Sequence, residues 1–504
     1  MKVFLAGYNV DTDALNELKE QGKAREDLTP EVLSAAYARI SRDPRPINEI
    51  RVDARSEVER ARRSNTSIIF KMGHHSVAEH AVFNLDILGV SRLAMEELER
   101  FRLSSYTEKS QRYITLDKDF VIPEEIKGSS LEKTFADMVR KQNKAYFELF
   151  ERLKTHVFDK HADLAQDPKN HNLLEGWAKE DARYITALAT ESQVGQTINA
   201  RNLELLLRRF ASHPLSEVRQ LGKAIYERVS DVAPSIIIFH EANDRDSKMY
   251  PELKELAGKL IGSHAELKTK DDAALVQLVE YTQKGDQIIA ASLLHTSSNL
   301  PYEECRSITE KLPQDKQKEI FKTAWQNLQV YDSMPREFEY ANLTFNIVLS
   351  SACFGQLKRH RMSSITAQPY DTSLGLTIPE AIKEIGMKGY FCQIADETNE
   401  VYAKIKDKNP LAAPYVLTNA HRKRVLIRVN AREMYHISRL REDQHAQWDI
   451  QNISREMSRQ AKRVMPLTFA LLGGKDRYND VYHEIFGHLP KVAEVVLPGA
   501  RNIK

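Results

Sequence analysis

The chain has 504 residues, and its 73 lysines and arginines almost balance its 71 aspartates and glutamates, which leaves a formal net charge of +2. At about 150 residues per domain, this length accommodates roughly two to four globular domains. The balanced charge excludes a whole-chain attraction to nucleic acid or to an anionic membrane. An anionic substrate would therefore be held by local groups of residues.

The three cysteines, Cys305, Cys353 and Cys392, form no CxxC pair and cannot all be paired with one another. This usage indicates a reducing compartment and excludes a multi-cysteine metal centre, so we expect a cytoplasmic protein. The longest apolar runs, such as 235–239 and 467–472, are far shorter than the ~20 residues of a membrane-spanning helix. We therefore expect a soluble protein whose partners include neither a membrane nor a nucleic acid.

In chain order, the N-terminal run 1–8 predicts a short β-strand, because acidic residues follow it too soon for an export signal. Apolar residues at helical spacing predict amphipathic helices over 31–40 and 57–70. The alternating run 81–87 predicts a half-buried strand.

Residues 91–101 return to helical spacing, and the polar, serine-rich stretch 103–113 predicts a loop. The segments 131–160 and 173–232 carry many charges, periodic apolar residues and few prolines or glycines. They predict a middle region made mostly of helices.

A change to a Lys-, Asp- and Glu-rich composition at 260–280 suggests a boundary, and we divide the chain into domains 1–265 and 266–504. Beyond the boundary the same order recurs: a strand-like run at 343–348, a helix-like run at 350–359, a polar loop and a long helical region. The chain is predicted to be duplicated.

The duplication is visible in the residues themselves. Arg100-Phe101-Arg102-Leu103-Ser104-Ser105-Tyr106-Thr107 matches Arg359-His360-Arg361-Met362-Ser363-Ser364-Ile365-Thr366 at a shift of 259 residues. Further on, Asn199-Ala200-Arg201 matches Asn430-Ala431-Arg432 at a shift of 231, so the second copy is 28 residues shorter between these landmarks. A period above 200 residues indicates two copies of a whole domain and not a solenoid.

Closely spaced arginines followed by serines and threonines, as at Arg100 and Arg359, suit a phosphate-binding site, because guanidinium groups offer planar paired donors. The alternative is a solvated basic helix end placed favourably against the helix dipole. Recurrence in both copies favours function.

Metal and nucleotide motifs are otherwise absent from the sequence. The cluster His74 to His80 lacks a second group of ligands, and His483 and His488 are one residue too far apart for a zinc-binding helix. No GxGxxG or GxxxxGK[ST] motif is present. We therefore expect no metal, and no Rossmann or P-loop cradle.

Read in order, these motifs resemble the flavin-dependent thymidylate synthase family, whose signature is RHRxxSxNxxSxRY. The first copy carries Gly73-His74-His75-Ser76, Glu79-His80, Ser91-Arg92, the Arg100 to Tyr113 run, Arg183 and Asn199-Ala200-Arg201. The second copy carries Asn430-Ala431-Arg432, Leu440-Arg441 and His445-Ala446-Gln447-Trp448-Asp449-Ile450. The resemblance implies an α+β fold of two tandem thymidylate-synthase-complementing-type domains, each a small, mostly antiparallel sheet with long helices.

Each copy departs from the family pattern in a complementary way. In the first, Phe101 replaces the signature histidine, Thr107 the asparagine, and Glu97 a nucleotide-binding glutamine. In the second, the lost positions of the loop and of the later arginine are Ala367, Pro369, Asp371 and Pro414. Family members are homotetramers with active sites between subunits. The resemblance therefore implies a fused pair that forms a homodimer, a pseudo-tetramer, with a composite site built from both halves.

The resemblance implies reductive methylation of dUMP to dTMP, with FAD as redox cofactor, methylenetetrahydrofolate as carbon donor and NADPH as reductant. It assigns Arg441 a catalytic position beside the uracil ring. The residues implied for dUMP are Gln356, Arg359, Glu108, Ser110, Arg112, Arg183 and Arg441. Those implied for FAD are Ser76, Arg359, His360, Arg361, Asn430, Arg432 and His445. The alternative is a flavin- or nucleotide-binding relative with a different or lost activity.

Overall fold

The computed structural model describes residues 1–21, 27–40, 43–111, 119–262 and 274–491. The chain forms two compact units that alternate along the sequence. The first unit contains Met1–Thr269 and Ile378–Ala420, and the second contains Lys270–Thr377 and His421–Lys504. Among the helices in the described ranges, none has the length and apolar character that crossing a membrane requires.

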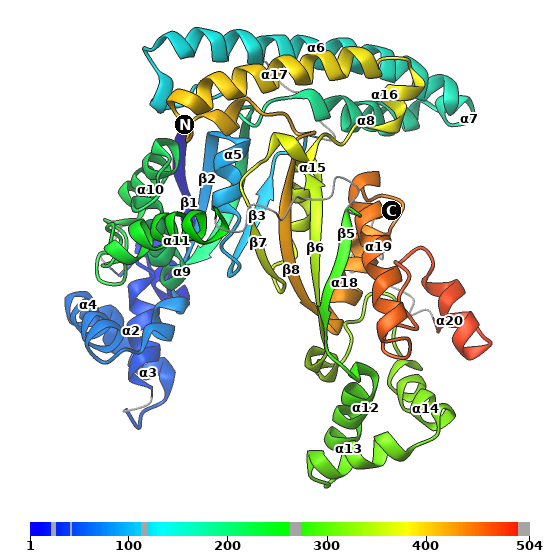
Figure 1. Ribbon diagram of the computed structural model, residues 1–504. Coiled ribbons are helices and arrows are strands. Elements are labelled where there is room, and N and C mark those ends of the chain that lie inside the picture. Colours follow the sequence, from blue (N-terminus) through cyan, green and yellow to red (C-terminus); the bar gives the residue numbers. More distant parts are fainter. Residues whose placement is uncertain (22–26, 41–42, 112–118, 263–273, 492–504) are drawn as a thin grey trace. The chain divides into compact units, whose positions relative to one another are not determined.

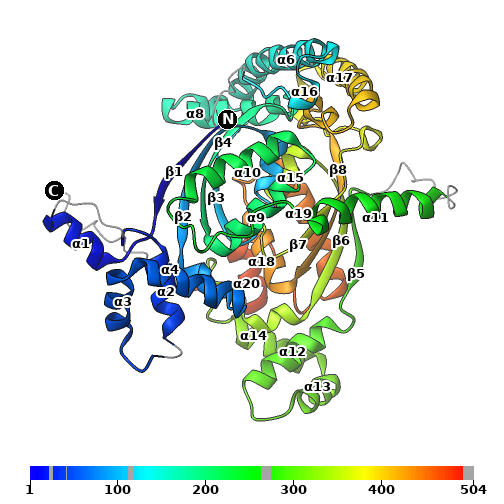
Figure 2. The same cartoon turned by 90° about the vertical axis from the view of Figure 1, so that its left-hand side faces the viewer.

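The first unit is built on a four-stranded antiparallel sheet (Figure 1). Phe83, Leu85 and Ile87 alternate along one strand and are fully buried, whereas the intervening Asn84 and Asp86 are exposed, so one face of the sheet is apolar. Helices α9 (Ala200–Ala211) and α10 (Ser216–Val229) lie across one face (Figure 2). In spatial order the strands are β1 (Lys2–Tyr8), β2 (Val82–Ser91), β4 (Glu191–Asn199) and β3 (Ser104–Glu108).

Further helices surround this sheet. A small apolar core of Val32, Ala36, Ile50, Ala54 and Val58 joins three of the N-terminal ones. The N-terminal helices are α1 (Thr12–Gln21), α2 (Glu31–Arg39), α3 (Ile47–Ser56) and α4 (Val58–Thr66), and α5 (Arg92–Leu98) and α11 (Asp244–Gly262) follow later.

Two long helices, one from each copy of the repeat, pack together in the first unit. Helix α6 (Ser130–Lys160) and helix α17 (Lys388–Lys408) lie side by side (Figures 1 and 2). The buried Gln142 of α6 donates to Thr398 Oγ1 at 2.8 Å and to the carbonyl of Val416 at 2.9 Å. The shorter helices α7 (Ala162–Ala165), α8 (His171–Ala182) and α16 (Glu380–Glu384) lie near them.

The two copies also exchange backbone hydrogen bonds where these helices end. Ala187 and Thr418 form an antiparallel bridge, and their separation equals the 231-residue shift of the repeat. Leu188 N donates to Leu417 O at 2.7 Å, and on the other side Ala420 N donates to Tyr184 O at 2.9 Å. Equivalent residues therefore pair with one another, as they do across a two-fold axis.

The second unit repeats the strand order of the first. Its sheet packs on a core that includes Trp325, Phe338 and Phe345. The strands in spatial order are β5 (Val276–Tyr281), β6 (Asn342–Ser350), β8 (Arg422–Asn430) and β7 (Ser364–Ala367). The helices are α12 (Gly285–Thr296), α13 (Tyr302–Lys311), α14 (Gln314–Trp325), α15 (Ser351–Leu357), α18 (Ala431–Arg441), α19 (Trp448–Val464) and α20 (Tyr478–Phe486).

The predicted fold class, α+β with two small antiparallel sheets, is confirmed. The prediction of a loop over 103–113 was wrong in part, because β3 lies in it, and the prediction of helices over 173–232 missed β4. In β4 the buried positions alternate, but two of them hold Ser192 and Gln196, so the polar side chains hid the period-two pattern. The long helical region predicted at the end of the second copy likewise contains a strand, β8, in which Lys423 occupies a buried position.

The 28-residue difference between the copies has a structural origin. Helix α6 has 31 residues and α17 has 21, and the fully described stretch 409–412 contains no counterpart of α7 and α8. The predicted domain boundary at 265/266 lies outside the described residues and stays a prediction. The compact units differ from the predicted domains in that residues 378–420 belong to the first unit.

We predict that Asn419→Ala lowers the free energy of unfolding by about 2–4 kcal/mol, because the buried hydrogen bonds of its amide are lost. The two hydrogens of Asn419 Nδ2 are shared among Arg183 O, Thr186 Oγ1 and Gln111 Oε1, which lie at 3.1, 3.0 and 3.2 Å. Urea-induced unfolding measures the change. Gln393→Ala, on the exposed side of α17, is the control and should change stability by less than about 0.5 kcal/mol.

Candidate functional site

A buried polar cluster joins α15 to α18 in the second unit. Arg441, at the last position of α18, donates from Nε to His360 Nε2 at 2.9 Å and from Nη2 to the carbonyl of Gln356 at 3.2 Å. The side chain of Gln356 is buried and donates to Gln447 Oε1 at 3.3 Å. Because α15 ends at Leu357, the following turn carries His360 to the side chain of Arg441.

His360 is held in its neutral form. Its side chain is 2% exposed, and burial together with the nearby charge of Arg441 lowers its pKa to about 3. Since Nε2 accepts the hydrogen bond from Arg441, the single ring proton resides on Nδ1. A neutral acceptor therefore orients the guanidinium of Arg441 without cancelling its charge.

Glu433, in the first turn of α18, lies on the far side of this imidazole. Its Oε1 lies 3.4 Å from Nδ1 of His360 and, among the described contacts, has no hydrogen-bond partner. Burial raises the pKa of the Glu433 carboxyl. The His436 ring meets the His360 ring edge-on at a centroid distance of 5.7 Å. Four ionisable side chains thus form one continuous group.

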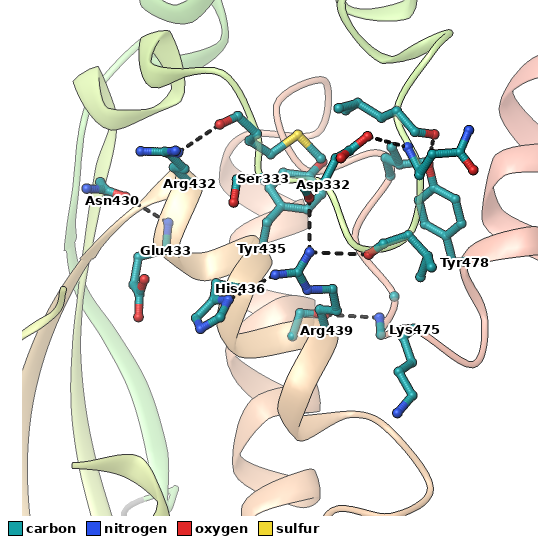
Figure 3. Close-up of a pocket in the computed structure, with 18 of the residues that line it drawn as sticks. Asp332, Ser333, Asn430, Arg432, Glu433, Tyr435, His436, Arg439, Lys475 and Tyr478 are labelled. Atoms are coloured by element: carbon teal, nitrogen blue, oxygen red, sulfur yellow. Dashed lines mark hydrogen bonds between the residues drawn. The ribbon is translucent and has the colours of Figure 1, made fainter. Parts of the chain in front are cut away.

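A cavity of about 380 Å³ opens beside this group (Figure 3). Helix α18 contributes Arg432, Glu433, Tyr435, His436 and Arg439 to its wall, and Asn430, the last residue of β8, lies beside them. The other walls come from residues 328–334 before β6 and from residues 471–478 after α19.

Two arginines of this wall are anchored by carbonyl and carboxylate groups. Arg432 donates to the carbonyl of Met334 at 2.8 Å and to Glu339 Oε1 at 2.7 Å. Arg439 donates to the carbonyls of Val330 and Asp332 at 3.2 and 3.0 Å. The cavity therefore has fixed cationic groups together with the rings of Tyr435 and Tyr478.

The first copy replaces the His–Arg pair with two phenylalanines. At the repeat shifts given above, His360 corresponds to Phe101 and Arg441 to Phe210. These two rings pack edge-to-face at a centroid distance of 5.8 Å, and both are buried. The polar cluster of the second copy is an apolar contact in the first.

The first copy has its own buried ion pair at the start of α5. Arg92 Nη1 contacts Glu108 Oε1 at 2.7 Å and Oε2 at 3.0 Å, and Ser192 donates to the same carboxylate at 3.1 Å. Both partners of the pair are at most 7% exposed. In the second copy the equivalent positions hold Ser351, Ala367 and Lys423, and the ammonium of Lys423 lies 4.4 and 4.0 Å from two ring centroids.

The remaining predicted site residues are distributed over both units. In the first unit Ser76 is exposed, Ser110 is half-buried and Arg183 is buried, while Arg112 lies outside the described residues. In the second unit Arg359, Arg361 and His445 are exposed. Asn430 accepts a hydrogen bond from Glu433 N at 2.8 Å and so caps α18. In the described ranges, no group of three or more metal-ligating side chains occurs.

Comparison with known proteins assigns the family. The family model described as thymidylate synthase complementing protein matches residues 23–235 and again residues 277–467. The chain therefore belongs to the thymidylate synthase complementing protein family and contains two copies of its domain.

Individual relatives fall into two groups. A flavin-dependent thymidylate synthase of Clostridium tetani is 30% identical over 41% of this chain and 80% of its own length. A UPF0159 protein of Chlamydia muridarum is 23% identical over 82% of this chain and 81% of its own length. A UPF0159 protein of Thermoplasma acidophilum is 22% identical over 86% and 92%. Of these three relatives, the two that span both copies have names that state no activity.

Sequence reasoning missed Glu433, His436 and Phe210. Glu433 looked like an ordinary acidic residue in a helical first turn, and only its burial against His360 distinguishes it. Phe210 could have been found from the 231-residue shift, which aligns it with Arg441. Arg92 belongs to the Ser91-Arg92 motif of the first copy, but its ion pair with Glu108 is a tertiary contact.

We predict that His360 makes the protein less stable in acid. The unfolded imidazole takes up a proton near its ordinary pKa of about 6.5, whereas the folded one stays neutral until about pH 3. The free energy of unfolding should therefore fall by about 2 kcal/mol between pH 7 and pH 5 because of this residue alone. His360→Gln should remove that part of the slope in urea titrations. An NMR signal of His360 that titrates above pH 5 would contradict the assignment.

Proposed function

We propose that this protein converts dUMP to dTMP by FAD-dependent reductive methylation, with methylenetetrahydrofolate and NADPH as co-substrates. Family membership supports the general class, and the reciprocal pattern of losses supports the specific proposal. The observation that carries it is the Arg441–His360 pair at 2.9 Å in the second copy, whose first-copy equivalents are two packed phenylalanines. One copy retains the polar chemistry that the other has lost.

Arg441 is the catalytic residue of the proposal. A fixed cation beside the uracil ring stabilises negative charge that develops on the base during the transfer. His360 and the carbonyl of Gln356 determine the orientation of that cation, so little reorganisation is needed during the reaction. The proposal requires no protein nucleophile, and the buried Cys305 and Cys353 have no role in it.

The cavity beside α18 fits part of a large polar cofactor such as FAD. Arg432 and Asn430 offer donors for phosphate or ribose oxygens, and Tyr435 and Tyr478 offer ring surfaces. Bound flavin would supply the hydride chemistry. We assign FAD to Ser76, Arg359, His360, Arg361, Asn430, Arg432 and His445, as the family resemblance implies.

The nucleotide dUMP is assigned to residues of the first copy, together with Gln356, Arg359 and Arg441 of the second. Ser110, Arg112 and Arg183 would bind it, and Glu108, oriented by Arg92, would accept from the nucleotide. In the second copy, Ser110, Arg112 and Arg183 are replaced by Pro369, Asp371 and Pro414, respectively. We therefore propose a composite site that uses residues of both halves in a homodimer. The three widely spaced cysteines, with no CxxC pair among them, fit a reducing compartment such as the cytoplasm.

Purified full-length protein tests the proposal directly. We expect a flavin absorbance spectrum and formation of dTMP from dUMP, methylenetetrahydrofolate and NADPH. Bound flavin without dTMP would instead support a relative with another substrate, and absence of flavin would support a non-catalytic nucleotide-binding protein. Both results would contradict the proposal.

We predict that the double variant His360→Phe/Arg441→Phe folds but loses at least about 10³-fold in kcat/KM for dTMP formation. It recreates the Phe101–Phe210 pair of the first copy, so its circular dichroism spectrum and midpoint of unfolding should stay close to those of the wild type. The single Arg441→Phe variant should be less stable than the double, because it leaves the His360 nitrogen without its donor.

Phe101→Leu is the matched control, since it alters the equivalent position in the copy that has lost these polar groups. Its kcat/KM should remain within about threefold of the wild type. Equal losses of activity in Phe101→Leu and in the double variant would show that the difference between the two copies is not functional.

A further inference from the structure

Helix α11 presents an apolar surface that the described residues of its own unit do not cover. Its 19 residues include no buried residue. Leu253, Leu256 and Leu260 are 52, 51 and 60% exposed, and Met249 is 36% exposed. Helices of this length are marginal in water unless they bury one face, so the surface calls for a partner.

The helix lies outside both matches to the family model, which end at residue 235 and resume at residue 277. It is joined to the first unit at its beginning, where Arg208 Nε contacts Asp246 Oδ2 at 2.8 Å and Asn243 N donates to Ser212 Oγ at 3.2 Å. The apolar surface is therefore a feature of this chain and not of the family domain.

The spacing of the apolar residues is that of a coiled-coil seam. Met249, Leu253, Leu256 and Leu260 follow one another at intervals of four, three and four residues, which are the d, a, d and a positions of a heptad. Pro251 is at position f, on the side away from the seam, where it does not obstruct a partner. A second helix can pack along this seam.

The flanking residues indicate which partner and which direction. The g positions hold Glu252 and Lys259, and the e positions hold Tyr250 and Ala257. In an antiparallel pair g faces g and e faces e, so each Glu252 meets a Lys259 and each large Tyr250 meets a small Ala257. In a parallel pair Glu252 would meet Ala257 instead. The helix is thus complementary to an inverted copy of itself.

We propose that α11 is a dimerisation element that packs antiparallel against α11 of a second copy of this chain. Leu253 of one copy packs on Leu256 of the other, Met249 packs on Leu260, and the two Glu252–Lys259 ion pairs border the seam. Such a contact is isologous and closes on itself, so it produces a dimer and not a filament. Lys259 contacts Glu255 on its own helix, and its side chain is 71% exposed, so its ammonium can reach the partner.

Charge reversal in the full-length chain tests the pairing. Glu252→Lys alone and Lys259→Glu alone each place like charges opposite one another, and each should raise the dissociation constant of the dimer about tenfold in sedimentation equilibrium. An equimolar mixture of the two variants restores opposite charges across the seam and should restore the wild-type constant. Unfolding midpoints should be unchanged, because both side chains are exposed.

Cysteine cross-linking in a Cys392→Ser background tests the direction. A mixture of Met249→Cys and Leu260→Cys chains should form a disulfide between them. Each variant alone should not, because in an antiparallel pair the two copies of Met249, or of Leu260, are offset by about 16 Å along the axis, well beyond the ~7 Å that a disulfide spans. Self-linking of either variant, or a dimer that is insensitive to all four substitutions, would overturn the proposal.

A monomeric chain would also overturn it. Leu253→Asp/Leu256→Asp is the strongest disrupting variant and should abolish the dimer without loss of folding, since neither leucine is buried.

Discussion

The backbone exchange between residues 184–189 and 415–420 is the contact on which the architecture of the first unit depends. Each copy alone would leave these amide and carbonyl groups without partners in a buried region, which is costly. Pairing with the equivalent residues of the other copy satisfies them, and the side-chain amide of Asn419 adds hydrogen bonds shared among three acceptors at the same place. Residues 378–420 consequently belong to the first unit although they lie in the second half of the sequence.

Duplication under this constraint leaves the shared contact in place and allows the rest to diverge. Tyr184 and Tyr415, which are equivalent at the 231-residue shift, are both fully buried beside the exchange. At the polar sites, by contrast, each copy holds what the other has replaced. The His360–Arg441 pair of the second copy corresponds to Phe101–Phe210 in the first. The Arg92–Glu108 pair of the first copy corresponds to Ser351 and Ala367 in the second. In each case the replacement removes both charged or polar partners together, which avoids a lone buried charge.

Much of the fold and part of the site could be predicted from the sequence. Helices α2 and α6 and strands β1, β2 and β6 followed from periodicity, because their buried faces are apolar. Strand β4 did not, since buried Ser192 and Gln196 interrupt its pattern. Asn430 and Arg441 stood out through their ordered motifs, whereas the neutral state of His360 follows from burial and from one hydrogen bond to a residue 81 positions away.

The sequence by itself determined that the chain contains two copies of one domain, that neither copy keeps the whole signature, and which copy lacks which residues, because these are properties of residue identity and spacing. Only the tertiary structure decided that the helices of both copies build one unit, that Phe101 and Phe210 pack against each other, and that Glu433 lies against His360. These facts depend on packing between segments far apart in the chain, and no local pattern of side chains encodes such distances.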